Sequence, residues 1–170
     1  TPLTVTSLTM TPLKPGTLLI ASFDLEDHER HLVEQGHITA TLFTRTVILL
    51  VHYESGSQPL GLVLNSPMGD RLKRYSNEAI ERYITGLDQE SRPAEDLFYW
   101  GGPCEADKLT FMHRIEACAQ TSRTVYPGLY FGGDLDAVRE HIAIGAGEPA
   151  DLRYFLGYAG WDPGQLENEI

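Results

Sequence analysis

The chain has 170 residues, 42% of them hydrophobic, which is enough to bury one hydrophobic core and fits a single domain. Thirteen Lys and Arg residues oppose 24 Asp and Glu residues, so the net charge of −11 repels phosphate backbones and disfavours nucleic-acid binding. Two cysteines in the whole chain are typical of a reducing compartment. No apolar run approaches the roughly 20 residues of a membrane span, and the start lacks the basic-then-apolar order of a signal peptide. We therefore expect a cytoplasmic protein that does not enter a membrane.

The first residues predict an arm, a strand and a helix. Residues 1–14 are rich in Thr and Pro and predict a mobile arm, followed by a single domain over residues 15–170. Residues 17–21 form a short apolar run after a Pro-Gly turn signal, which favours a buried strand. From Asp24 to Gly36, the helical spacing of apolar residues predicts a short surface helix.

Further strands are predicted by runs rich in β-branched, aromatic or other apolar residues, at 38–53, 60–64, 97–100, 109–113, 125–131 and 153–158. The first two are separated by turn residues and predict a β-hairpin. Residues 109–113 are expected to be the antiparallel neighbour of residues 97–100. Pro127 and Gly128 break the run that contains them.

Three more helices are expected between and after these strands. Helical spacing predicts one over residues 75–87, and Asp134 is a suitable N-cap for a second, which Gly145 ends. Asp162 at the N-cap and Gln165 three residues later form a capping-box variant that predicts a third helix. Few residues follow, and an isolated helix shorter than about 12 residues is marginal, so we expect the chain to stop partway along an element.

Candidate catalytic and metal-binding residues are few. Cys104 follows a Gly-Gly-Pro turn and is a candidate nucleophile with His113 as its base, although a small buried Cys is the commoner role. His28, His31 and His37 form a cluster, but their spacing matches no zinc template. No Gly-X-Ser-X-Gly elbow is present. The sequence therefore contains no complete catalytic signature, and we expect neither a cofactor nor a metal.

A binding site is the stronger hypothesis. Asn65 ends an apolar run, where binding residues often lie, and it also fits a cap of the turn before a proline. Trp161 and Gln165 lie at the last strand-to-helix turn, where a packed Trp with capping partners is the alternative. We predict that Asn65, Trp161 and Gln165 converge on one cleft. The full set of candidate binding residues is Asn65, Gly102, Asp134, Trp161, Gln165 and Glu167.

Six segments, in this order along the chain, resemble the YqgE/AlgH family of bacterial proteins. They are residues 16–21 (GTLLIA), 43–50 (FTRTVILL), 60–67 (LGLVLNSP), 100–103 (WGGP), 129–134 (LYFGGD) and 154–167 (YFLGYAGWDPGQLE). Three features depart from the family pattern. Residues 27–43 are longer than the usual link, so we interpret the His-bearing helix as an insertion. Ser66 stands where Arg is common, and the Trp-containing segment that usually follows the last helix is absent.

The resemblance implies an α+β fold with a bent, largely antiparallel and partly barrel-like sheet surrounded by helices, and no established biochemical activity. Some members are described as transcriptional regulators, but the net charge of −11 and the lack of a helix-turn-helix pattern argue against direct DNA binding. We rank first a binding or regulatory domain that acts through a protein or small-molecule partner. An enzyme that uses a cleft near Asn65 and Trp161 comes second, and a DNA-binding regulator third.

Overall fold

The structure is a computed structural model, and it describes residues 5–6, 12–21, 45–68 and 97–170. The predicted His-bearing helix and the helix predicted over residues 75–87 lie outside these ranges. Two residues of the predicted arm form strand β1 (Val5–Thr6), which pairs with strand β2 (Leu18–Ala21). Within the described ranges, no helix is long and apolar enough to cross a bilayer.

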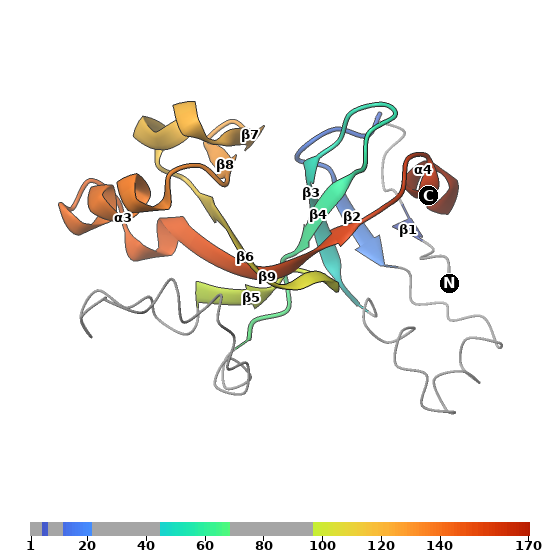
Figure 1. The fold of residues 1–170 in the computed structure, drawn as a ribbon, viewed down its shortest axis with the longest axis horizontal. Coiled ribbons are helices and arrows are strands. Elements are labelled where there is room, and N and C mark those ends of the chain that lie inside the picture. Colours follow the sequence, from blue (N-terminus) through green and yellow to red (C-terminus); the bar gives the residue numbers. More distant parts are fainter. Residues whose placement is uncertain (1–4, 7–11, 22–44, 69–96) are drawn as a thin grey trace.

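Nine strands in the described part of the chain form one sheet, in the order β1-β2-β3-β4-β9-β6-β8-β7, with β5 beside β9. The remaining strands are β3 (Val47–His52), β4 (Leu60–Val63), β5 (Phe98–Trp100), β6 (Cys104–His113), β7 (Arg123–Tyr126), β8 (Leu129–Phe131) and β9 (Leu152–Gly160). Figure 1 shows the sheet curled into a half-barrel with two limbs, β2-β3-β4 and β6-β8-β7, which β9 joins. This confirms the predicted α+β fold with a bent, largely antiparallel sheet.

Local sequence signals account for the first limb. The predicted hairpin is confirmed, because β3 and β4 pair antiparallel from Ile48 opposite Val63 to His52 opposite Leu60. Buried and exposed residues alternate along β2, as they do in a strand with one face on the core. The middle of β3 is buried throughout, because its two faces contribute to two different apolar clusters.

Three apolar clusters fill the half-barrel and its flanks. The concave side between the limbs holds a cluster that includes Leu49, Met112 and Phe155. On the convex side of the first limb, Trp161 and Leu166 pack against β2, β3 and β4. Helix α3 (Leu135–Ala143) contributes Leu135 and Val138 to the third cluster, against β5, β6 and β9.

Helix α3 begins and ends where the sequence predicts. Asp134 Oδ1 accepts a hydrogen bond from the Ala137 N–H at 3.1 Å, so Asp134 is the N-cap. Gly145 follows the helix with a φ of 76°, a left-handed conformation that glycine adopts without steric cost. Two short 3₁₀ helices flank this region, at Glu116–Thr121 and Pro149–Asp151.

The last helix starts later than predicted. Asp162 N–H does donate to Gln165 Oε1 at 2.9 Å, which is half of the expected capping box. That bond closes a turn, however, because Gly164 has a left-handed φ of 80°, which a right-handed helix cannot contain. Helix α4 therefore spans only Gln165–Glu169.

The predicted pairing of residues 97–100 with residues 109–113 is wrong. Strand β9 lies between them: β5 pairs parallel with β9, and β6 pairs antiparallel with its other edge. The chain crosses from one edge to the other at Gly101 and Gly102, where it passes directly over Gly157 of β9. A hairpin was expected because β5 and β6 are close in sequence, but the order of strands depends on β9, about fifty residues further along.

Candidate functional site: an apolar hollow on the concave side

Asn65 lies at the end of the first limb and is bonded to that limb. Its Oδ1 accepts from the Val47 N–H at 2.9 Å, and its Nδ2 donates to the Arg45 carbonyl at 2.7 Å. Arg45 has a φ of 58°, so the Asn65 amide stabilises an uncommon left-handed backbone at the start of β3. Both ends of the amide thus have a structural role at the start of β3, which differs from the predicted cap of the turn before Pro67.

The other predicted residues of the cleft lie around α4. Trp161 is 3% exposed, and its Nε1 donates to Glu169 Oε2 at 3.1 Å. Gln165 Nε2 donates to the other oxygen of Glu169 at 2.7 Å. Trp161, Gln165 and Glu169 thus hold the five-residue helix α4 against the end of β9.

Glu167 connects the same helix to the first limb. Its Oε1 accepts from the Tyr53 hydroxyl at 2.7 Å, and this hydrogen bond is the main reason that the pKa of Tyr53 is raised. Tyr53 directly follows β3, so α4 is attached to the hairpin as well as to β9.

The predicted convergence of Asn65, Trp161 and Gln165 on one cleft is wrong. Leu60, at the start of β4, pairs with Gly160 next to Trp161, whereas Asn65 lies beyond the other end of β4. At about 3.3 Å per extended residue, the two ends are about 15 Å apart. Asn65 and the α4 residues also have no common hydrogen-bond partner among those that the structure describes.

Gly102 lies at the point where the chain crosses β9. A β-carbon there would be 2.2 Å from the carbonyl carbon of Tyr158, and one at Gly101 would be 2.2 Å from the Gly157 oxygen. The third glycine of the crossing, Gly157, has a φ of 67° and would place a β-carbon 2.2 Å from the Gly102 oxygen. These glycines permit two backbones to touch, which is a packing role.

Cys104 and His113 do not form a catalytic pair. They are the first and last residues of β6, which puts them on the order of 25 Å apart along one strand. Cys104 instead pairs with Tyr158 of β9. The expected hairpin that would have brought the two together does not exist, because β9 occupies its place.

His113 is buried and is fully engaged in the second limb. Ser122 Oγ donates to the Cys118 carbonyl at 3.0 Å, so His113 Nε2, at 2.8 Å from Ser122 Oγ, is the donor of that bond. His113 Nδ1 accepts from the Ile115 N–H at 3.3 Å. Burial lowers the pKa of His113 and keeps the ring neutral, which suits a structural bridge between β6 and Ser122.

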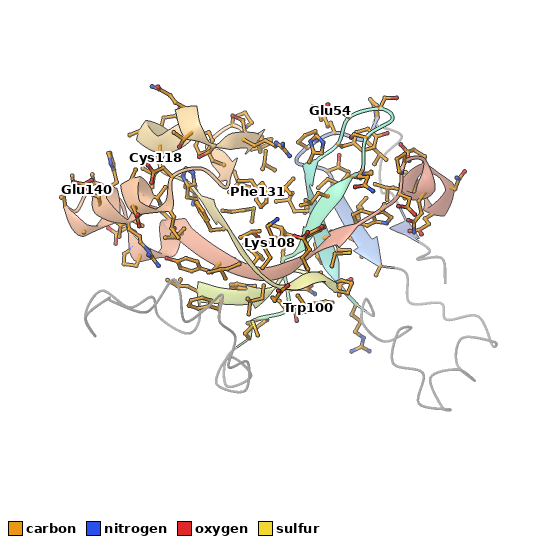
Figure 2. All side chains as sticks on the ribbon, in the orientation of Figure 1. Glu54, Trp100, Lys108, Cys118, Phe131 and Glu140 are labelled. Atoms are coloured by element: carbon orange, nitrogen blue, oxygen red, sulfur yellow. The ribbon has the colours of Figure 1, made fainter. Side chains whose placement is uncertain are left out.

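The candidate site that the structure does offer is an open hollow of about 290 Å³ on the concave side of the sheet. It lies where β4, β9, β6 and β8 approach one another, and its walls are mostly apolar. Figure 2 shows two of its residues, Lys108 and Phe131, between the two limbs. The lining residues are Leu60, Lys108, Leu109, Thr110, Phe111, Phe131, Gly132, Gly133 and Tyr158.

Thr110 is one of the lining residues, and it carries an unusual buried polar group. Its Oγ1 is buried and has no hydrogen-bond partner in the described part of the chain. Leaving a buried hydroxyl unpaired costs about 1–3 kcal/mol, so such groups are rare in folded proteins and call for an explanation.

Two polar side chains accompany Thr110 in the lining. Lys108 Nζ lies 2.9 Å from Glu105 Oε2, and this ion pair raises the pKa of Lys108. Burial raises the pKa of the Tyr158 phenol, with a smaller contribution from Glu105, so Tyr158 is a neutral donor at physiological pH. The hollow thus combines apolar walls with two neutral hydroxyls and one paired ammonium.

None of the six predicted binding residues lines the hollow. The sequence carried one signal for it: Lys108, Thr110 and Met112 alternate with Leu109 and Phe111, which puts Thr110 between a Lys and a Met on one face of the strand and the two apolar residues on the other. An alternating strand gives no sign of whether a hydroxyl on it is paired, so the site could not be found from that pattern.

The curled sheet and its helices define a single-domain α+β protein with a half-barrel core. Residues 31–170 match the family model described as AlgH-like, and the chain belongs to that family. A protein of Chlorobaculum parvum described as a UPF0301 protein is 34% identical over 93% of this chain and 71% of its own length. The UPF0301 protein CT0663 of Chlorobaculum tepidum is 35% identical over the same shares. The resemblance stated from the sequence is thereby confirmed.

Two solved structures have the same fold. The solution structure of the AlgH protein from Pseudomonas aeruginosa has a TM-score of 0.51 and 29% identity, over 75% of this chain and 64% of that one. The crystal structure of protein DIP2367 from Corynebacterium diphtheriae has a TM-score of 0.57 over 96% of this chain and 74% of that one. At 20% identity, the second comparison concerns the fold alone.

Proposed function

We propose that this chain is a binding domain that takes a small, largely apolar molecule into the hollow between its two limbs, and that it acts in the cytoplasm. The observation that carries the proposal is the apolar hollow of about 290 Å³, which residues of both limbs line. Ligand sites are typically concave and apolar, with a few polar groups that orient the ligand. The volume lies just below their usual range of about 300–1,000 Å³.

Binding is favoured over catalysis by the state of the candidate catalytic groups. His113 uses both ring nitrogens in structural hydrogen bonds, and its burial keeps it neutral. Burial also raises the pKa of Cys118, which leaves that thiol protonated and a poor nucleophile. Asn65 and Trp161, near which an enzymatic cleft was expected, are bonded to separate parts of the fold.

An NMR titration with toluene tests the proposal, since toluene is an apolar probe small enough for the hollow. We expect saturable shifts of the backbone amides of Thr110 and Gly132, with a Kd on the order of 1 mM, which corresponds to about −4 kcal/mol. Leu60→Trp places an indole on a lining residue and should abolish these shifts. Leu18→Trp is the matched control, because Leu18 is 52% exposed on β2 and does not line the hollow. Shifts that are absent, or that survive Leu60→Trp, would contradict the proposal.

A further inference from the structure

Gly132 and Gly133 are consecutive lining residues of the hollow, and we call them the glycine rim. Both have left-handed φ angles, of 68° and 101°. Because glycine has more conformational freedom than any other residue, the position of the rim depends on the groups that hold it. On one side, the Gly132 N–H donates to the Phe111 carbonyl of β6 at 2.9 Å.

Two hydroxyls hold the other side of the glycine rim. The Asp134 N–H, directly after the rim, donates to Thr121 Oγ1 at 3.2 Å. A β-carbon at Gly133 would lie 2.3 Å from Ser122 Oγ, so the Ser122 side chain packs directly against the Gly133 backbone. A movement of Thr121 or Ser122 would therefore move the wall of the hollow.

His113 fixes the position of Ser122. Its Nε2 donates to Ser122 Oγ at 2.8 Å, and Ser122 Oγ donates to the Cys118 carbonyl. The His113 ring also interacts with the Gly132 backbone, and its centroid lies 6.1 Å from that of Phe111, another lining residue. His113 is not itself a lining residue, so it can influence a ligand only through these neighbours.

This arrangement requires a neutral imidazole. His113 Nδ1 accepts from the Ile115 N–H at 3.3 Å, and a protonated Nδ1 would instead point a second donor at that N–H. A charge at this buried position is also costly, and burial is the main reason that the pKa of His113 is lowered. Protonation therefore displaces the ring or its neighbours and weakens the hydrogen bond to Ser122.

The titratable groups around the ring do not offset this cost. Those on the described elements packed around it are Arg114, Glu116, Cys118, Tyr130, Asp134 and Asp151. None of them is among the causes of the lowered pKa of His113. The Tyr130 ring centroid lies 5.3 Å from that of His113, and a hydrogen bond to Glu116 raises the pKa of Tyr130, so this neighbour is uncharged.

We propose that His113 is a positioning residue for the hollow: through Ser122 its neutral ring holds the glycine rim in place, so that occupation of the hollow and protonation of His113 oppose each other. This inference rests on the proposed function, because it concerns the regulation of the same hollow. The coupling is reciprocal, so a bound ligand favours the neutral ring by the same free energy as the neutral ring favours the ligand.

The pH dependence of toluene binding tests this coupling, because toluene has no group that titrates and any pH dependence belongs to the protein. We expect the Kd from the shifts of the lining amides to rise about two- to fivefold as the pH falls from 7 to 5. In the same samples, toluene should move the titration midpoint of the His113 imidazole signals to lower pH. Circular dichroism at each pH checks that the fold persists.

Three variants identify the groups responsible. His113→Gln removes the titrating ring, so the Kd of toluene should no longer change between pH 7 and 5. Ser122→Ala removes the bridge to the glycine rim and should reduce the change by at least about half. His141→Gln removes a histidine of α3 that does not line the hollow, and it should keep the wild-type profile.

The results separate this inference from the proposed function. Toluene that binds at pH 7 with a Kd constant down to pH 5, or down to the pH at which the fold is lost, would overturn the role of His113 and leave the binding hollow intact. A wild-type profile retained in His113→Gln would overturn it too. An unchanged His113 midpoint in the presence of toluene is equally decisive, and it needs no variant to fold. If toluene does not bind at pH 7, the proposed function itself fails, and the role of His113 with it.

Discussion

The crossing of the chain over β9 leads us to predict how alanine at each of two glycines would change the stability of the protein. Gly157 and Gly132 have nearly the same backbone conformation, with φ angles of 67° and 68°. A β-carbon at Gly157 would lie 2.2 Å from the Gly102 oxygen and 2.9 Å from the Cys104 oxygen. A β-carbon at Gly132 would meet nothing within 4 Å. The substitutions Gly157→Ala and Gly132→Ala thus impose the same backbone strain, but they differ in the space available to the new β-carbon.

The expected costs follow from these distances. Both alanines lose about 1–2 kcal/mol to left-handed strain, and both recover about 0.4–1 kcal/mol because alanine restricts the unfolded chain. The net cost at Gly132 is therefore about 1 kcal/mol. At Gly157 the crossing backbones must also move apart, and overpacking adds about 1–3 kcal/mol or more. We expect Gly157→Ala to destabilise the protein by at least about 2 kcal/mol more than Gly132→Ala.

Urea unfolding followed by circular dichroism measures both costs. For each variant, the midpoint should fall while the slope of free energy against urea stays at the wild-type value, since the surface exposed on unfolding is unchanged. A Gly157→Ala protein that fails to fold, beside a folded Gly132→Ala protein, agrees with the reasoning. Two variants within about 0.5 kcal/mol of each other would refute the account of the crossing as a tight backbone contact.

Three further predictions concern other described groups. The folded-state pKa of His113 is lowered, so its contribution to stability is complete above the unfolded pKa of about 6.5 and is lost as pH falls below it. In His113→Gln the free energy of unfolding should be lower at pH 8 by about 1–2 kcal/mol. Its decline as pH falls below about 6.5 should be smaller than in wild type. Asp134→Ala should cost about 1 kcal/mol, by loss of the Ala137 hydrogen bond, in thermal unfolding against an Asp136→Ala control. Iodoacetamide should alkylate buried Cys118 at least about tenfold more slowly than partly exposed Cys104. Mass spectrometry of digested samples measures both rates, and equal rates would show that the thiol of Cys118 is accessible.

Features that depend on neighbours in sequence were predictable. The β3–β4 hairpin has its strands and its turn residues within one short segment, and the structure confirms it. Asp134 is an N-cap because the hydrogen bond it accepts comes from the N–H three residues later. Strand and helix signals of this kind are complete within a few residues, so tertiary packing had little to change.

Features that depend on distant partners were not predictable. The neighbour of β5 is β9, and no property of residues 97–113 indicates that another strand separates β5 from β6. Asn65 and Trp161 each follow the end of a strand, but these two strand ends lie at opposite ends of β4. The Thr110 hydroxyl is buried without a partner because no described residue hydrogen-bonds to it, which is a property of the packed core.

The position of β9 has a consequence for the order in which the protein folds. Strands β4, β5 and β6 all pair with β9, although they precede it by about 40 to 90 residues in the chain. During synthesis, neither limb has its common neighbour until residues 152–160 leave the ribosome. Closing such long loops is slow, so the sheet should assemble late and in one step. Until then, the facing edges of β4 and β6 remain unpaired, and unpaired strand edges are sites of aggregation in a nascent chain.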